Sequence, residues 1–181
     1  IVNPDVKKAF VMRSRFIRHM RSYLDERGYI EVETPVLNTI AGGAAARPFI
    51  THHNTLNLDM YMRIATELPL KRLIIGGMDR VYEIGRIFRN EGMDTKHNPE
   101  FTTVELYQAY ADFHTMMDIA EGILSSAAME LHGSYQIEWL GETVDLTPGW
   151  RRMTMVDAVK EYAGVDFGVI SDDVQAVEAA R

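Results

Sequence analysis

The chain contains no cysteine, which excludes disulfide bonds and thiolate metal sites within its 181 residues. It has no apolar run close to the ~20 residues that a membrane-spanning helix needs, and we see no signal peptide. An excess of basic residues is missing too: the net charge is −7, which argues against this segment as the main contact for a polyanion. We therefore expect a cytoplasmic protein that makes no contact with a membrane.

The hydrophobic content of 46% is ample for the packed core of one domain. Helices are predicted where apolar residues recur at helical spacing between capping residues and glycines. These helices are residues 4–27, residues 67–75, a long helix from Asp112 to Gly133, and a helix from Thr154 to about Gly164. The predicted strands are residues 28–37, 49–51 and 56–63, two strands in residues 81–107, and a hairpin around Leu140-Gly141. Because strands and helices do not alternate strictly, we expect an α+β fold with an antiparallel sheet flanked by helices.

His52-His53-Asn54-Thr55 is predicted to form the turn between the strands at 49–51 and 56–63.

The two ends of the chain are unusual. The chain begins without methionine, and residues 171–181 start like a capped helix that has no terminating residue. From these ends we expect an excised fragment of a longer protein.

The most informative stretch lies between Val81 and Tyr107. Side chains on a strand repeat every second residue, so Phe101, Glu105 and Tyr107 share one face of the second strand. An antiparallel pairing would place Arg89 on the same surface. We therefore expect a cation, an aromatic ring, an anion and a phenol together, with Arg89 and Glu105 opening into one shared cavity.

Phe88-Arg89-Asn90-Glu91, a polar loop and then His97-Asn98-Pro99-Glu100-Phe101 resemble motif 2 of the class II aminoacyl-tRNA synthetases. Residues 39–49 and 66–71 are similar to segments of the class II lysyl-tRNA synthetases of bacterial type. The helix, Gly28, strand and Pro35 resemble motif 1, which builds the dimer interface in that family. The resemblance implies that residues 1–181 form the N-terminal part of the catalytic domain and that the protein is a homodimer through motif 1.

The resemblance also implies the reaction, which is ATP-dependent activation of L-lysine to lysyl-adenylate followed by transfer to tRNA(Lys). By resemblance, Arg89 bridges the α-phosphate and the lysine carboxylate, as the catalytic residue of this set. Glu91 would accept a hydrogen bond from the adenine amino group, and Phe101 would stack on the adenine ring. His97 and Asn98 would lie near the triphosphate.

Lysine needs anionic groups for its two ammonium groups. By resemblance, Glu105 and the Tyr107 hydroxyl hold the side-chain ammonium, while Glu67 and the backbone carbonyl of Gly43 hold the α-ammonium. Without ligand, a carboxylate among apolar strand residues would be strained or hydrated. The alternative is an internal salt bridge from Glu105 to one of three arginines, Arg63, Arg80 or Arg86.

The histidines predict no metal site. His52 and His53 are adjacent, so on a strand they would point to opposite faces, and the helical histidines have no partner at ligand spacing. The third class II motif, which in the family contains the Mg²⁺ ligands, has no counterpart here, nor does the anticodon-binding domain. We therefore expect Mg²⁺ to be held outside these residues, and the fragment alone to have weak activity or none.

Two other functions remain open at this point. One is a paralogue that transfers lysine to a protein or lipid acceptor, since such relatives drop or attach domains. The other is a non-catalytic module derived from a synthetase. Retention of Arg89, Glu91, Phe101, Glu105 and Glu67 together speaks against the module.

Overall fold

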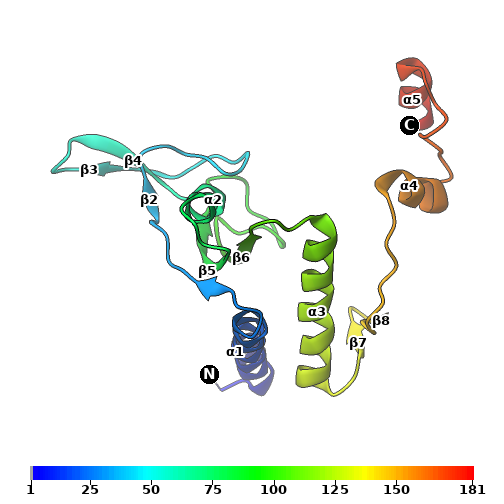
Figure 1. Ribbon diagram of the computed structural model, residues 1–181, viewed down its shortest axis with the longest axis horizontal. Helices are drawn as coiled ribbons and strands as arrows, with labels where there is room; N and C mark the ends of the chain where they lie inside the picture. Colours follow the sequence, from blue (N-terminus) through cyan, green and yellow to red (C-terminus); the bar gives the residue numbers. More distant parts are fainter. Residues whose placement is uncertain (1) are drawn as a thin grey trace. The chain divides into compact units, whose positions relative to one another are not determined.

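A computed structural model describes residues 2–181, which divide into one unit ending at Ser134 and a second unit, Tyr135–Arg181 (Figure 1). The helices of the first unit are α1 (Pro4–Asp25), α2 (Glu67–Ile75) and α3 (Phe113–His132). Its strands are β1 (Ile30–Glu31), β2 (Leu37–Asn38), β3 (Ile50–His53), β4 (Leu58–Met62), β5 (Arg80–Phe88) and β6 (Glu100–Gln108). The second unit contains β7 (Gln136–Trp139), β8 (Glu142–Asp145), α4 (Met155–Ala163) and α5 (Asp173–Ala179). The α+β class is confirmed, whereas the assignment of all 181 residues to one catalytic domain stays a prediction.

The predicted capping residues set the helix ends. The Asn3 side chain accepts a hydrogen bond from the backbone amide of Asp5, and Pro4 is the first residue of α1. The carboxylate of Asp112 caps α3 through the amide of Thr115, and Gly133 ends it with a left-handed φ of 72°.

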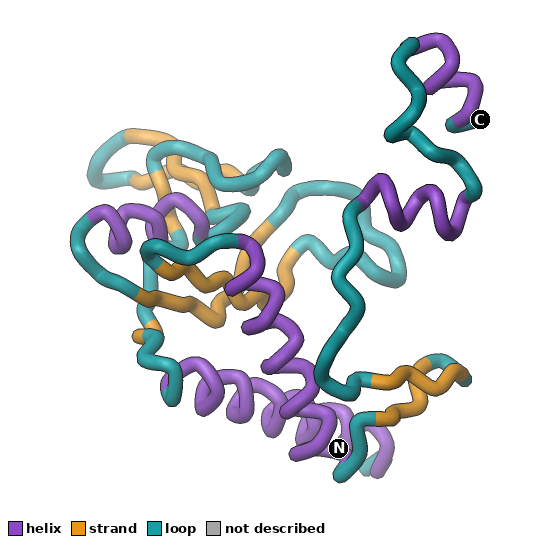
Figure 2. Tube along the Cα trace, turned by 45° about the vertical axis from the view of Figure 1, so that its right-hand side comes forward, coloured by secondary structure: helices purple, strands orange, loops and turns teal. Residues whose placement is uncertain are grey.

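The hairpin of β5 and β6 is the centre of the first unit. These strands pair antiparallel, with Glu83 opposite Glu105 and Ile87 opposite Phe101. β1 adds to β5 in parallel, and a second sheet has the order β2-β4-β3. Figure 2 shows the strands in orange. The predicted antiparallel layout therefore holds except at β1.

One face of the β5–β6 hairpin packs on helices. Tyr82 and Ile84 on β5, with Val104 and Leu106 on β6, pack against α1 and α3, which contact each other. Figure 1 shows α1 below the hairpin and α3 beside it. The residues of this core are Phe16, Met20, Tyr23, Leu24, Tyr29, Tyr82, Ile84, Val104, Leu106, Met116, Ile119 and Ile123. The opposite face, with Glu83 and Glu105, is left for the polar residues and for α2.

Two predicted elements differ from the structure. The strand expected over residues 28–37 is reduced to Ile30–Glu31 and Leu37–Asn38, because beyond Val32 side chains replace the strand ladder. There Thr34 donates its hydroxyl hydrogen bond to Glu83 and its carbonyl accepts one from Arg63. His52 and His53 belong to β3 and pair with β4, so the turn is formed by residues 54–57 instead.

The second unit follows its sequence closely. Leu140 and Gly141, both with positive φ, make the two-residue turn between β7 and β8, the geometry that this kind of hairpin requires. The Thr154 hydroxyl caps α4 through the amide of Asp157, and Gly164 ends that helix. None of the helices in residues 2–181 combines the length and the hydropathy that a membrane-spanning helix needs.

Candidate active site

Arg89 continues the hairpin beyond the end of β5. Its backbone amide donates to the carbonyl of Pro99 over 2.8 Å, so the strand pairing holds Arg89 next to Phe101. The guanidinium carbon lies 5.3 Å from the centre of the Phe101 ring, within the range of a cation–π contact. The predicted neighbourhood of cation and aromatic ring is confirmed.

A cavity of about 170 Å³ opens between these two side chains and the loop that follows β5. Its lining brings together all five residues predicted for the nucleotide, Arg89, Glu91, His97, Asn98 and Phe101, and adds Gly92 and Lys96. Sequence reasoning missed Lys96, although a second cation beside His97 in a polar loop was a signal that anions are bound there. The cavity thus has two cations, one carboxylate and an aromatic wall.

Asp94 holds the loop around this cavity. Its carboxylate accepts backbone hydrogen bonds from Lys96 and His97, and the His97 imidazole lies 2.8 Å from it. These hydrogen bonds, that of the imidazole first, lower the pKa of Asp94 below its usual value. Asp94 is therefore ionised at neutral pH, and its contribution to the loop is lost only as the pH falls through this lowered pKa.

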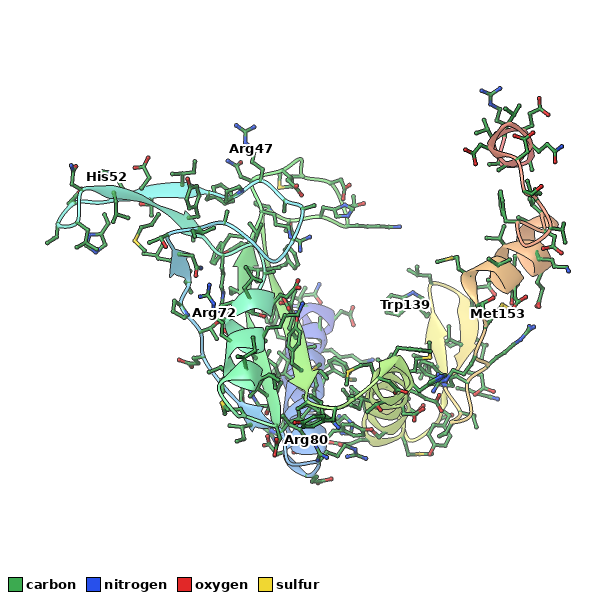
Figure 3. All side chains as sticks on the ribbon, turned by 45° about the horizontal axis from the view of Figure 1, so that its top comes forward. Arg47, His52, Arg72, Arg80, Trp139 and Met153 are labelled. Carbon is green, nitrogen blue, oxygen red and sulfur yellow. The ribbon has the colours of Figure 1, made fainter. Side chains whose placement is uncertain are left out.

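The segment of small residues before β3, residues 41–48, closes against the same loop. The carbonyl of Arg47 accepts a hydrogen bond from the amide of Asn90, and the Arg47 amide donates to the Glu91 carboxylate over 3.3 Å. The side chain of Arg47 projects outward from the segment (Figure 3). Glu91 is thus positioned from outside its own loop, and its contact with adenine stays a prediction.

Glu105 lies farther along the same face, beside the start of α2. One oxygen accepts a hydrogen bond from the amide of Thr66 over 3.0 Å, and the other accepts from the Tyr107 hydroxyl over 3.2 Å. Thr66 makes no side-chain cap of its own, so Glu105 satisfies the free amide at this helix end. Burial, with the nearby Glu105 charge, raises the pKa of Tyr107, which keeps the phenol protonated as a donor at neutral pH.

Neither the alternative of an arginine salt bridge nor the expectation of a cavity shared with Arg89 holds for Glu105. Within residues 2–181 it forms no salt bridge to an arginine: Arg63 pairs with Glu83, and Arg80 donates to the carbonyl of Arg27. Glu105 also does not line the cavity beside Arg89. The two groups share a face, but the carboxylate turns toward the uncapped end of α2 instead of toward the guanidinium.

Gly43 and Glu67 meet where the segment of small residues crosses the start of α2. Gly43 has a φ of 89°, and a Cβ on it would lie 3.3 Å from the Cβ of Glu67 and 3.2 Å from that of Ala65. Only glycine combines this backbone angle with such a close approach. The Glu67 carboxylate is bound to the ammonium of Lys71, at 2.5 Å, one turn later on α2.

A buried ion pair, Arg63 with Glu83, lies next to Glu105 on this face of the hairpin, and it was not predicted from the sequence. Arg63, 7% exposed, lies 2.5 Å from the carboxylate of Glu83, 3% exposed, and also donates to the carbonyls of Thr34 and Arg86. The carbonyl of Arg63 accepts from the amide of Phe88, and the next carbonyl, of Ile64, accepts from Arg89 Nε over 3.4 Å. The segment from Arg63 to Thr66 therefore touches both the guanidinium and, through Thr66, Glu105.

Gly85 leaves the space in which the buried pair sits. A Cβ at this position would lie 2.3 Å from a terminal nitrogen of Arg63 and 3.1 Å from the Glu83 carboxylate. We expect Gly85→Ala to lower the free energy of unfolding by about 1–3 kcal/mol, as overpacking does elsewhere. Urea denaturation measures this. Gly92→Ala is the control, because a Cβ there meets no atom within 4 Å; equal stability of the two variants would contradict the packing argument.

The sequence of the chain is similar to those of known proteins over its whole length. Residues 1–176 match the family of class II tRNA synthetases (D, K and N). The chain is 58% identical over 181 residues to a lysine–tRNA ligase of Thermoanaerobacter sp. (strain X514), and 59% identical to one of Clostridium botulinum (strain Hall). Each alignment covers 100% of this chain and 36% of the relative, so the chain spans about a third of the length of these curated relatives.

Proposed function

Because this chain belongs to the class II tRNA synthetases of the D, K and N group, we propose that it is part of a lysine–tRNA ligase. The observation that carries the proposal is the order of charges along one face of the hairpin. Arg89 over Phe101 comes first, and Glu105 beside Tyr107 follows on the same strand. If ATP binds at Arg89 and Phe101, and lysine binds with its side chain at Glu105, the α-phosphate and the lysine carboxylate would lie next to each other.

The proposed reaction is attack of the lysine carboxylate on the α-phosphorus of ATP. An oxygen–phosphorus bond forms to give lysyl-adenylate, and the bond to pyrophosphate breaks. A hydroxyl of the tRNA end then takes the lysyl group and releases AMP. No protein nucleophile is needed, so the enzyme contributes alignment and charge stabilisation.

Arg89 is the proposed catalytic residue. Its planar guanidinium presents several N–H donors, which suit two oxyanions at once, one on the α-phosphate and one on the lysine carboxylate. Phe101 stacks on adenine in this proposal, and Glu91, held by the Arg47 amide, accepts from the adenine amino group. His97 and Asn98, with Lys96, line the cavity on the side assigned to the triphosphate.

The other end of the face favours lysine among the three amino acids of the family. Aspartate and asparagine would need a cation or neutral donors for their side chains, whereas this face offers Glu105 and Glu67. We assign Glu105, with the Tyr107 hydroxyl, to the side-chain ammonium. Glu67 and the carbonyl of Gly43 are assigned to the α-ammonium.

Lysine-dependent exchange of pyrophosphate into ATP tests this activity. The experiment uses the full-length protein, meaning the whole polypeptide in which these residues occur. We expect exchange with lysine and none above background with aspartate or asparagine. Absence of exchange with all three would favour the non-catalytic module.

The acceptor is tested separately, by supplying the full-length protein with radiolabelled lysine and ATP. We expect acid-precipitable label on tRNA. Label on a protein or lipid fraction instead would support the paralogue.

Further parts of the proposal concern assembly, location and metal. The exposed apolar side chains of Phe10 and Val11 on α1 support a homodimer through this helix, and we propose a cytoplasmic location.

ATP reactions of this kind use Mg²⁺, which screens phosphate charge when bound. Within residues 2–181, no group of three or more His, Asp or Glu side chains is placed to hold a metal ion.

A further inference from the structure

One cation of the chain already lies where the proposed function places a cation of the substrate. The Lys71 ammonium is 2.5 Å from the Glu67 carboxylate and 5.9 Å from the centre of the Tyr107 ring. Tyr107 in turn donates to Glu105. The lysine side chain therefore reaches from α2 to the edge of the same group of acids and phenol that is assigned to the amine substrate.

We infer that Lys71 is an internal competitor of the substrate: its ammonium occupies Glu67 in the free protein and is displaced by the α-ammonium of bound lysine. This inference rests on the proposed function, since it takes Glu67 as a substrate contact. Lys71 makes no contact with the reacting atoms in this arrangement. It acts through Glu67 as a residue that sets affinity and specificity.

The ion pair between Glu67 and Lys71 is of a kind that breaks easily. Glu67 and Lys71 are one helical turn apart, and their side chains are 32% and 52% exposed, so solvent screens the attraction. The flexible lysine stem can swing into water without moving α2. Binding of an α-ammonium then exchanges one ion pair for another of the same type.

Displacement would also contribute to specificity. A ligand that lacks an α-amino group cannot displace Lys71 from Glu67. The Glu67–Lys71 ion pair then stays intact, and Glu67 does not contribute to the affinity for that ligand. A ligand with the amino group gains Glu67 but has to release Lys71. Removal of Lys71 should therefore benefit only ligands of the second kind.

Lys71→Met tests the inference, because it removes the charge and keeps the length of the stem. We expect the Kd of the full-length protein for L-lysine, measured by calorimetry, to fall about two- to fivefold, the range that an exposed ion pair supplies. The Kd for 6-aminohexanoate, which is lysine without its α-amino group, should not change. The gain for L-lysine should shrink at high salt.

Arg72→Met is the matched control. It removes one positive charge from the next position of α2 (Figure 3). Arg72 lines a cavity of about 280 Å³ with residues of β2 and β4, and neither Glu67 nor Lys71 belongs to that lining. We expect this variant to bind L-lysine as the parent protein does. Thermal unfolding of both variants shows whether α2 is intact.

The outcomes separate the inference from the proposed function. If Lys71→Met binds L-lysine as the parent does, or more weakly, the inference is overturned while the function stands. An equal gain for 6-aminohexanoate, or the same gain in Arg72→Met, overturns it as well. If the folded parent protein does not bind L-lysine at all, the proposed function fails, and the inference fails with it.

Discussion

Replacing Glu105 by alanine is expected to weaken the binding of L-lysine by about 2–5 kcal/mol and to leave the binding of ATP nearly unchanged. Glu105 is the carboxylate assigned to the side-chain ammonium, and it lies outside the cavity beside Arg89 that is assigned to the nucleotide. Loss of a charge partner for a desolvated ammonium leaves that ammonium unpaired, which accounts for the size of the effect. Calorimetric titration of the full-length protein with each ligand measures both affinities.

Two further variants make the Glu105 experiment specific. Glu105→Gln keeps an oxygen that can accept from Thr66 but removes the charge, so it separates support of α2 from attraction of the ligand. Glu100→Ala removes a carboxylate from the same strand, where Glu100 pairs opposite Phe88 and its side chain belongs to the other face. Equal losses for lysine and ATP in Glu105→Ala, or a loss in Glu100→Ala, would contradict the assignment.

The parts of the structure that depend on local rules could be predicted from the sequence. The two-residue period fixes which side chains of β6 share a face, and the pairing of β5 with β6 then places Phe101 near Arg89. The start of α1 and both ends of α3 and α4 follow from single capping residues and glycines, which act within one turn of the helix. These rules need no knowledge of distant contacts.

The buried ion pair could not be predicted in this way. Glu83 and Glu105 lie opposite each other on the same face, so the pattern offers both as partners for Arg63. The choice depends on residues far apart in the sequence, because Arg63 also donates to the carbonyls of Thr34 and Arg86. Those contacts hold its guanidinium beside Glu83.

The orientation of Glu105 has a similar cause. The pattern places its side chain on the correct face, but Thr66 on another element supplies the amide toward which it turns. Likewise, residues 32–36 have the composition of a strand, yet Thr34 is bound to Glu83 and Arg63 instead of to a neighbouring strand. A sequence pattern gives the face of a side chain, whereas its partner is decided by packing between elements.

Breaking the buried ion pair of Arg63 and Glu83 is expected to destabilise the fold. We expect Glu83→Met to lower the free energy of unfolding by about 3–5 kcal/mol, because it leaves the guanidinium of Arg63 buried without its counter-charge. Urea denaturation followed by circular dichroism measures the loss. Glu31→Met is the control, since Glu31 pairs with Arg21 in a partly exposed bridge whose expected contribution is only about 0.2–1 kcal/mol.

The double variant Arg63→Met/Glu83→Met distinguishes charge from packing. If the unpaired charge causes the loss, removing both partners should cost less than the sum of the two single variants, because no buried charge remains. The double variant should still lose lysine-dependent activity: Arg63 no longer ties Thr34 to Arg86, and the segment that contacts Arg89 and Glu105 loses its anchor. Additive stability losses would show that the unpaired charge is not the cause. Full activity in the double variant would show that the pair does not support the site.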